Sequence, residues 1–382
     1  MEVKKTRVAI ITNIITTYRK GFYDRLFKND QLDVNVFCQD NMPGMNFISI
    51  HEQYPDNVKI IKFLSAKGEK IAWQFLPWRK ILNEFDVIFI AGNPRVLSDF
   101  FLGTYLRIIN KNVVLWTMAH SYRSNQTREF IRLLWSRIFK WLFLYTDKEA
   151  DYLRKKGFKN HFMLGMNNGL DQKNIDKSIT FWPIDKLKTW QKANGLENKI
   201  IIVSSARLEL KNKFELVLKA MPALVNSIPN IHWCLIGGGN QEFNLKNLAG
   251  ELGIKEHVTF VGSLYEEKKL APYFLSSVLF IHPAAIGLSL LHAFGYGLPV
   301  IVHGKSHLHS SEYGAFQDGL TGCNFIENDH KDLARVTTEL INKPDKRDKM
   351  KLTVQKIVRE QFNVDIMVER FVEMAKYVSN QK

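Results

Sequence analysis

The chain has 382 residues, 46% hydrophobic and 12% aromatic, and this composition excludes an intrinsically disordered protein because it supplies enough apolar surface for substantial cores. Lys and Arg outnumber Asp and Glu by 53 to 38, a formal net charge of +15. Residues 1–171 contain 26 basic and 16 acidic side chains, and so carry +10 of that charge. We therefore expect an anionic partner, such as nucleic acid, an acidic lipid or a phosphorylated small molecule.

The N-terminus and the cysteines bear on the compartment. The first twenty residues begin like a signal peptide, but Thr12 and Asn13 interrupt the apolar run and no small-residue cleavage site follows. Residues 7–14 are better interpreted as a first strand. The three cysteines are far apart and form no CxxC motif, which predicts reduced, mostly structural thiols and a cytosolic protein.

Short β-rich runs alternate with helical ones in the first half. Helices are expected after the first strand, after the strand 86–92 and over 123–141, and a loop is expected from there to the segment NNGLD at 167–171. The strands of this half are expected at 8–12, 32–38, 86–92 and 112–120.

The same rhythm restarts after the polar stretch 172–198, which we interpret as the junction of two α/β units. Helices are expected at 213–227 and 241–252. The strands are expected at 200–206, 231–239, 257–262 and 278–283. Strands that alternate with helices predict, in each unit, a parallel sheet covered by helices on both faces.

Residues 270–304 contain no Asp, Glu, Lys or Arg. By length and hydropathy alone this run would suit a transmembrane helix. However, Pro283 and Pro299 would each break a helix interior, and glycines are scattered between them. A buried strand, a turn, a helix with a Gly-rich end and a second buried strand explain the run better, so no membrane span is expected.

Chemistry in open parallel sheets is found beyond the carboxyl ends of the strands. In the second half these positions hold Arg207 with two nearby lysines, a Gly triplet at 237–239, Gly262, and AAIGLS at the start of a helix. Such glycines let phosphates approach backbone N–H groups, and the cations neutralise a diphosphate. Each feature also has a simpler interpretation, a tight turn for the triplet and a solvated side chain for the arginine.

Together these segments resemble the retaining GT-B glycosyltransferases of the family 4 type, the glycosyl transferases group 1. The segments in the second half are SARLELKNKFELVLKA (205–220), NIHWCLIGGGN (230–240), VTFVGSL (258–264), GLSLLHAFGYGLPVIV (287–302) and SEYGAFQDGLTG (311–322). Further similar segments are TTYRKGFYDRL (16–26), NNGLD (167–171) and NVDIMVERFVEMA (363–375).

The resemblance implies two Rossmann-like domains that face each other across a cleft. Residues 1–171 would form the N-terminal, acceptor-binding domain, and residues 172–362 the nucleotide-sugar-binding domain. Residues 363–382 would form a C-terminal helix that returns to the first domain.

The resemblance also implies donor-binding residues. Arg207 and a following lysine would hold the diphosphate. The family's lysine falls at Asn212, flanked by Lys211 and Lys213, of which we favour Lys213. The other positions implied are Gly239 in the glycine loop, Gly262 near the base, backbone at Gly287 and Leu288 near the phosphates, Glu312 against the sugar or ribose, and His120 facing the acceptor.

Two positions depart from the family's pattern. Its pair of glutamates, eight positions apart, corresponds to Ala284 and His292 in this chain. An alanine cannot hold a sugar hydroxyl or stabilise positive charge at the anomeric carbon. His292 is either a ribose contact, through one ring nitrogen, or a packed helical histidine.

The implied reaction is transfer of a glycosyl group from a nucleotide-diphospho-sugar to an acceptor hydroxyl with retention. No metal and no further cofactor are expected. Two alternatives stay open: a nucleotide-sugar epimerase of the same fold, and a catalytically silent sugar-nucleotide-binding protein. Nucleic-acid binding is not favoured, because no basic-aromatic motif is evident.

Two basic segments of the first half, 68–82 and 123–143, combine Lys and Arg with aromatic residues. Basic helices with exposed aromatics lie on anionic membrane surfaces, whereas a core-facing stripe is the simpler interpretation of either segment alone. Together they predict peripheral contact with the inner face of the plasma membrane and a lipid-linked glycan acceptor. The process implied is assembly of a bacterial surface polysaccharide, such as capsule, O-antigen or lipopolysaccharide.

Overall fold

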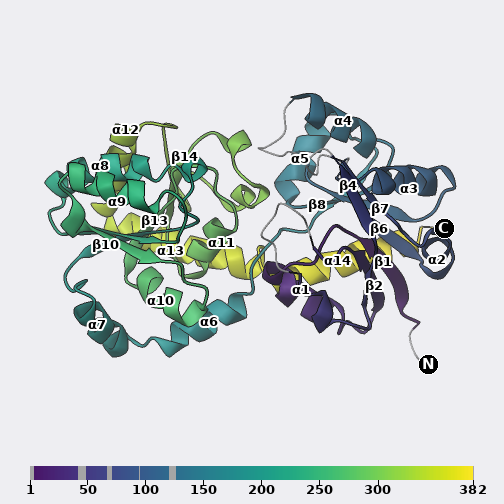
Figure 1. Cartoon of the computed structure of the whole chain (residues 1–382), viewed down its shortest axis with the longest axis horizontal. Helices are drawn as coiled ribbons and strands as arrows, with labels where there is room; N and C mark the ends of the chain where they lie inside the picture. Colours follow the sequence, from purple (N-terminus) through teal and green to yellow (C-terminus); the bar gives the residue numbers. More distant parts are fainter. Residues whose placement is uncertain (1–3, 42–48, 67–70, 94, 120–125, 382) are drawn as a thin grey trace. The chain divides into compact units, whose positions relative to one another are not determined.

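The computed structural model describes the whole chain except residues 1–3, 42–48, 67–70, 94, 120–125 and 382. It divides into two compact units (Figure 1). Unit 1 contains residues 1–168 and 364–382, and unit 2 contains residues 169–363. From the sequence we placed these boundaries at 171 and 362 and assigned the last helix to the first domain.

Unit 1 is built on a seven-stranded sheet in the order β3-β2-β1-β6-β7-β8-β9, in which all paired strands are parallel. Its strands are β1 (Thr6–Ile11), β2 (Leu32–Cys38), β3 (Val58–Ile60), β6 (Val87–Ala91), β7 (Val113–Thr117), β8 (Trp141–Leu144) and β9 (Phe162–Gly165). A separate antiparallel pair, β4 (Phe63–Ala66) and β5 (Ile71–Gln74), lies beside α3 (Leu97–Ile108).

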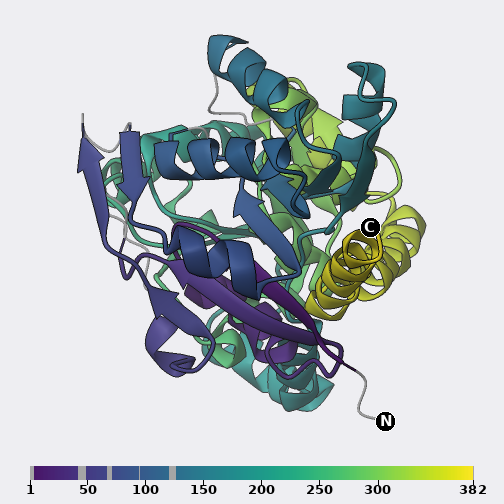
Figure 2. The same ribbon diagram turned by 90° about the vertical axis from the view of Figure 1, so that its right-hand side faces the viewer.

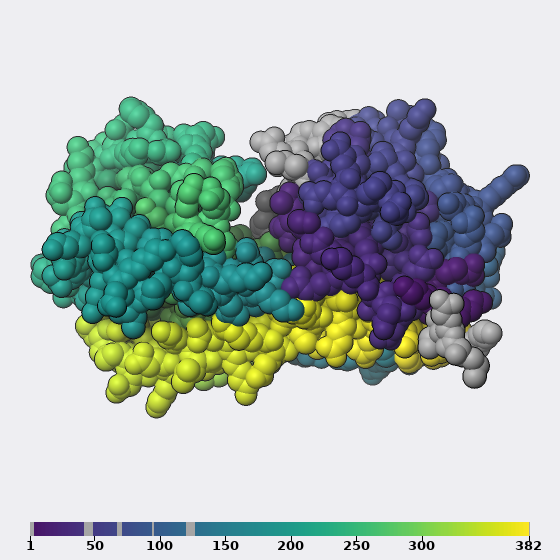
Figure 3. Space-filling view, turned by 90° about the horizontal axis from the view of Figure 1, so that it is seen from below, coloured from purple at the N-terminus to yellow at the C-terminus, as the bar shows by residue number. Residues whose placement is uncertain are grey.

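Both faces of this sheet are buried, as continuous apolar strands predict. Val8 and Ile10 of β1 pack in the core formed with α1 (Lys20–Leu26) and α14 (Val364–Ser379). The alternate residues Ala9 and Ile11 belong to a second core, on the opposite face of the sheet. That core is shared with α2 (Trp78–Glu84), α3, α4 (Gln126–Ser136) and α5 (Asp147–Lys155). Figure 2 shows helices of this unit on both sides of its sheet. In Figure 3 the last residues, in yellow, lie against the N-terminal residues, in purple.

Unit 2 repeats the architecture with six parallel strands in the order β12-β11-β10-β13-β14-β15. They are β10 (Ile200–Ser205), β11 (Ile231–Ile236), β12 (Val258–Gly262), β13 (Ser277–Ile281), β14 (Val300–His303) and β15 (Gly322–Phe325). One face is covered by α8 (Glu215–Ser227), α9 (Glu242–Glu251) and α12 (His330–Ile341). The other is covered by α6 (Gln172–Phe181), α10 (Glu267–Leu275), α11 (Leu288–Gly295) and α13 (Pro344–Glu360).

The sequence-based elements need three corrections. The helix expected to reach residue 141 ends at Ser136, and the expected loop that follows contains β8, α5 and β9. The junction 172–198 contains α6 and α7 (Ile184–Ala193). The segment 68–82 is not one helix, because its described residues form β5 and then α2. All three contain elements of ten residues or fewer, too short for periodicity to separate strand, helix and loop.

The structure of the uncharged run 270–304 agrees with the prediction made from its proline and glycine residues. It contains the end of α10, then β13, α11 and β14. Among the helices of the described residues, none has the length and hydropathy needed to cross a bilayer.

Candidate functional site

The strand order of unit 2 points to a binding site. The chain runs from β10 to β11 on one side and places β13 on the other side of β10, so the loops after β10 and β13 diverge. In open parallel sheets such a switch point creates the crevice in which ligands bind. The residues predicted from the sequence, Arg207 after β10 and Ala284 to Leu288 after β13, follow these two strands.

Arg207 is the most available cation at this edge. Its side chain is 61% exposed, and Nη1 lies 3.9 Å from Oε1 of Glu209. Lys211 is similarly exposed and pairs with the same Glu209. Exposed pairs of this kind are weak, so a diphosphate can replace Glu209 at little cost.

Lys213, which the sequence analysis favours, is held more firmly. Its Nζ donates a hydrogen bond of 2.8 Å to Asn328 Oδ1 and lies 3.5 Å from Glu327 Oε1. Its backbone is left-handed, with φ of 52°. Asn212, at the position of the family's lysine, donates from Nδ2 to the Arg207 carbonyl at 2.6 Å and so braces the loop.

The glycine triplet is explained by packing. A Cβ on Gly237 or Gly239 would overlap the carbonyl oxygens of Ala206 and Leu208, respectively, in the loop after β10. Gly262 has open space around its Cβ position but a φ of 81°, which favours glycine. The close approach of the loops after β10 and β11 therefore accounts for Gly237 and Gly239, and the backbone conformation accounts for Gly262.

The start of α11 combines a glycine with a carboxylate. Gly287 directly precedes the helix, and a Cβ there would lie 3.7 Å from Glu312 Oε2. Glu312 is buried. A helix N-terminus stabilises negative charge, whether this carboxylate or a ligand phosphate. Glu312 and any phosphate at Leu288 N–H would thus be close neighbours.

Three buried histidines, His282, His303 and His309, surround the loop that carries Ala284, and the sequence analysis did not single them out. Burial lowers the pKa of each to about 4, so all three are neutral near pH 7. His309 Nδ1 accepts a hydrogen bond from Ile286 N–H at 3.1 Å, and its ring stacks on that of His303. These neutral rings hold the loop in place without adding charge.

His292 faces the neighbouring helix α10. Its Nε2 lies 2.7 Å from Glu267 Oε1, which also accepts a 2.5 Å hydrogen bond from Tyr296 Oη. Burial acts to raise the pKa of Glu267, but the hydrogen bonds from His292 and Tyr296 hold it below its usual value. The structure therefore favours the packed-histidine alternative. Glu267 itself is a carboxylate that the sequence analysis missed, because nothing in the pattern pairs it with a residue 25 positions away.

Unit 1 presents its own carboxyl edge, where two arginines are buried. Arg19, after β1, places its guanidinium 5.2 Å from the Trp116 ring centre and 5.5 Å from that of Tyr145. Arg132 of α4 is 9% exposed, and its Nε and Nη2 have no hydrogen-bond partner among the described residues. Its charge is near Glu149, whose Oε1 accepts from Ala119 N–H just after β7. His120 lies outside the described residues.

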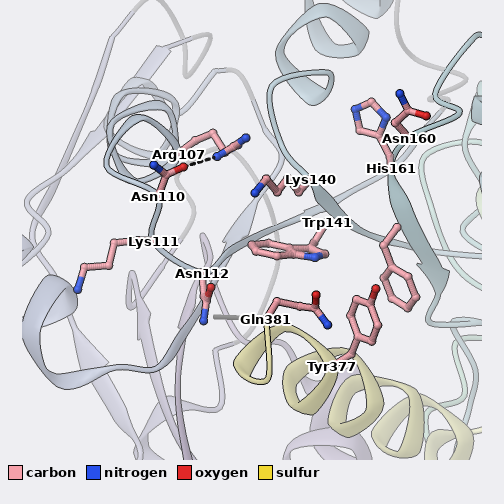
Figure 4. Close-up of a pocket in the computed structure, with 11 residues that line it drawn as sticks. Arg107, Asn110, Lys111, Asn112, Lys140, Trp141, Asn160, His161, Tyr377 and Gln381 are labelled. Carbon is pink, nitrogen blue, oxygen red and sulfur yellow. Dashed lines mark hydrogen bonds between the residues drawn. The ribbon is translucent and has the colours of Figure 1, made fainter.

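Two further polar atoms at this edge, Asn13 Oδ1 and Thr16 Oγ1, are buried and find no partner in the part of the chain that the structure describes. Buried polar groups are nearly always satisfied, so unsatisfied ones suggest a ligand or water. A pocket of about 650 Å³ lies elsewhere in unit 1, beside the amino ends of β7, β8 and β9 (Figure 4).

Comparison with known proteins adds a family and a fold. Residues 187–356 match the family model described as glycosyl transferases group 1. The chain is 26% identical over 228 residues to the putative glycosyltransferase EpsD of Bacillus subtilis, covering 56% of each protein. It is 27% identical over 154 residues to a GDP-mannose-dependent phosphatidylinositol monomannoside mannosyltransferase of Mycolicibacterium smegmatis, covering 38% of each. The alignments thus span about half or less of these curated relatives.

Solved structures match over nearly the whole chain. HepE of Anabaena in complex with UDP has a TM-score of 0.70 at 15% identity, with 98% of this chain and 100% of that one covered. A glycosyltransferase of Rickettsia africae has a TM-score of 0.73 at 12% identity, with 99% and 100% covered. At such identities the likeness concerns the fold. The chain therefore has the GT-B fold of two Rossmann-like domains, and its residues 187–356 are similar to the glycosyl transferases group 1.

Proposed function

We propose that the chain transfers a glycosyl group from a nucleotide-diphospho-sugar to an acceptor hydroxyl, with retention of anomeric configuration. The observation that carries this is the switch point of unit 2, where the exposed Arg207 follows β10, the start of α11 follows β13, and the sequence matches the group 1 family model. Relatives named as GDP-mannose-dependent mannosyltransferases, and a similar fold solved with UDP, support a nucleotide-sugar donor.

In this proposal the Arg207 guanidinium binds the donor's diphosphate through two hydrogen bonds and no longer pairs with Glu209. Lys213 adds a second positive charge, and Lys211 lies close enough to replace it. Backbone N–H groups at Gly287 and Leu288 complete the anion site, so that the protein itself stabilises the leaving group without a metal ion. No further cofactor is needed.

Recognition of the sugar would not use the first of the family's glutamate positions. Ala284 is buried and offers only its backbone. We therefore assign sugar or ribose contacts to Glu312, next to Gly287, with Gly262 and Gly239 near the nucleotide. His292 acts through Glu267, which it holds on α10.

The acceptor would bind in unit 1, where buried arginines and unsatisfied polar atoms occupy the carboxyl edge of the sheet. His120, by its place after β7, is proposed to face it. We further propose a lipid-linked glycan acceptor, a cytoplasmic location at the inner face of the plasma membrane, and a role in bacterial surface polysaccharide assembly.

The decisive test is a calorimetric binding screen of UDP- and GDP-sugars, with Arg207→Ala compared with Lys356→Ala, another exposed cation of unit 2. We expect the first substitution to weaken donor binding about tenfold or more, as loss of a charge-assisted bidentate contact does, and the second to leave it unchanged. If no nucleotide-sugar binds, the proposed function is wrong. If both variants bind like the parent, only the diphosphate assignment is wrong.

The absence of a carboxylate at Ala284 favours one alternative, a sugar-nucleotide-binding protein without turnover. Incubating the chain with donor, EDTA and lipid-linked or soluble acceptors tests this, with the anomeric configuration of any product read by NMR. Transfer in EDTA supports the enzyme, binding without transfer supports the silent protein, and conversion of the donor alone would indicate an epimerase.

A further inference from the structure

The helix α4 of unit 1 buries Trp135 but leaves a second group of apolar residues exposed. Phe130 and Leu134, one turn apart, are 65% and 57% exposed, and Ile131 beside them is 47% exposed. On the other side of the same helix Arg132 and Ser136 are buried. A helix that faces water alone buries its apolar stripe and exposes its charges. Besides the buried Trp135, α4 exposes three large apolar residues and buries a cation, so its outer face is suited to an apolar environment.

The neighbouring helix α3 extends this face. Phe101, Tyr105 and Ile108 recur at helical spacing, and all three are exposed, Ile108 by 72%. The two helices are joined by Trp135 of α4, whose ring centre lies 5.1 Å from that of Phe100 and whose Nε1 donates to Thr104 Oγ1. We call the six residues Phe101, Tyr105, Ile108, Phe130, Ile131 and Leu134 the α3–α4 surface. Exposed apolar side chains gathered on two helices that pack together suggest an interaction site.

The strand β5 adds an aromatic margin. The Trp73 ring centre lies 6.1 Å from that of Phe101, and Trp73 and Phe75 are both exposed. Aromatic rings with a polar edge, such as Trp and Tyr, concentrate at the boundary between lipid headgroups and acyl chains.

The net charge of the segments that contain α3 and α4 indicates what kind of surface would bind there. Residues 97–111 and 126–140 contain six basic side chains (Arg107, Lys111, Arg128, Arg132, Arg137 and Lys140) and two acidic ones (Asp99 and Glu129). Asp99 is fully buried, and burial raises its pKa to about 8, so it is mostly neutral at pH 7. Leaving out Arg132, which is buried, five basic side chains and Glu129 remain, and this positive balance complements an anionic surface.

The pocket in Figure 4 adjoins this surface. Arg107 donates from Nε to the carbonyl of Ile138, an exposed residue just after α4, and Arg107 and Lys140 both line the pocket. Trp141, Phe162 and Tyr377 supply rings, and no acidic side chain is found among its described lining residues. A cationic pocket next to an apolar face has the chemistry of a phospholipid, with the headgroup phosphate in the pocket and the acyl chains beside it.

We propose that the α3–α4 surface docks on an anionic bilayer, with its apolar residues in the headgroup–acyl boundary and Arg107 and Lys140 on headgroup phosphates. The docking follows from unit 1 alone and rests on the proposed function only for its purpose, which is to bring a lipid-linked acceptor to this unit.

Flotation of the full chain with vesicles tests the proposal. The parent chain should bind vesicles of phosphatidylglycerol and phosphatidylethanolamine, bind phosphatidylcholine vesicles much less, and lose affinity as salt is raised. The double variant Phe130→Ser/Leu134→Ser should bind the anionic vesicles at least about tenfold more weakly, because both side chains lose apolar contact with lipid. Lys140→Ala should weaken binding about fivefold, as expected for one basic residue at the surface.

Matched controls come from unit 2. Phe243→Ser/Leu352→Ser removes two apolar side chains of similar exposure, 73% and 70%, and should leave vesicle binding unchanged. Nucleotide-sugar binding, measured on the same samples, should be equal in the parent and all variants, which separates a failure of docking from a failure of the proposed function.

Three results would overturn the proposal. One is a parent chain that ignores anionic vesicles at low salt. Another is a Phe130→Ser/Leu134→Ser variant that binds them like the parent. The third is light scattering that shows a dimer of the parent dissociated by the same substitutions while vesicles are not bound, since the surface would then be an interface between two copies of the chain.

Discussion

The helices α12 of unit 2 and α4 of unit 1 are similar in length and amphipathic, yet only α4 leaves large apolar residues exposed. In α12 the apolar residues Leu333, Val336 and Leu340 are buried, Arg335 is exposed, and the Asp329 side chain caps the first turn. In α4 the exposed residues include Phe130 and Leu134, and Arg132 is buried. The apolar residues of α12 thus serve a core, whereas those of α4 serve a core through Trp135 and also form an outward apolar face.

The two units also differ in how they bury ionisable groups. The site edge of unit 2 buries histidines that must be neutral, whereas unit 1 buries a carboxyl, Asp99, that is stable when protonated. Acid should therefore weaken unit 2, and alkali should weaken unit 1. Each prediction below sharpens or breaks this contrast, from the largest expected effect to the smallest.

Acidification should destabilise unit 2. His282, His303 and His309 have pKa values lowered from 6.5 to about 4, chiefly by burial. Below pH 6.5 these histidines become protonated in the unfolded chain, whereas in the folded unit they stay neutral until about pH 4. The free energy of unfolding therefore falls between pH 6.5 and pH 4. We expect a loss of several kcal/mol in the free energy of unfolding. Hydrogen-exchange protection factors of β13 and β14 peptides, corrected for the pH dependence of intrinsic exchange, measure it, and protection that does not fall from pH 6.5 to 4 would contradict it.

Truncation of buried and exposed leucines should separate the two helices directly. Leu333→Ala in α12 should lower the free energy of unfolding by about 2–5 kcal/mol, because it opens a cavity in the core. Leu134→Ala in α4 should change it by less than about 0.5 kcal/mol, because that side chain is exposed. Urea denaturation of both variants tests the pair, and equal losses would mean that α4 packs its stripe inward.

Alkali should destabilise unit 1 through Asp99. Burial raises its pKa from 3.8 to about 8, so its contribution is fully present below about pH 4 and is lost as the pH rises through 8. Asp99→Asn keeps a neutral group that accepts from Ser98 Oγ and should remove this dependence, a loss on the order of 2 kcal/mol between pH 6 and pH 8 in the parent. Hydrogen exchange of α3 peptides at pH 6 and pH 8 distinguishes parent from variant, and an unchanged slope would exclude Asp99 as its source.

The smallest effect is expected at the contact between α10 and α11. Glu267→Gln should keep the packing but weaken the hydrogen bonds from His292 and Tyr296, at a cost of about 1–2 kcal/mol. If His292 acts only through Glu267, His292→Gln and Glu267→Gln should change donor affinity equally, as measured by calorimetry. A larger loss for His292→Gln would restore it as a direct ribose contact.

Much of the fold could be predicted from the sequence. The strand expected at 32–38 is β2, and the Pro and Gly breakers correctly divided the uncharged run into strands and a helix. The missed elements were short: WLFL is a four-residue strand whose pattern alone resembles the end of a helix. Parallel strands buried on both faces can be predicted from their continuous apolar runs. A very short strand cannot, because its conformation depends on the strands with which it pairs.

The approximate position of the candidate site could be predicted, because the carboxyl ends of parallel strands lie at one edge of the sheet whatever the order of the strands. Its details were not. The pairing of Lys213 with Glu327 spans more than a hundred residues, and the glycines at 237 and 239 are required by a neighbouring loop's carbonyls. Neither relation leaves a periodic signal in the sequence.

The sequence by itself determined two parallel α/β units, the cationic balance of the first half and the strand ends at which an anion site could form, because each depends on local pattern or composition. Only the tertiary structure decided that His292 meets Glu267, that neutral histidines hold the Ala284 loop, and that α4 turns its apolar stripe outward. A helical period shows that an apolar stripe exists, but which neighbour covers it is settled by packing between segments far apart in the chain.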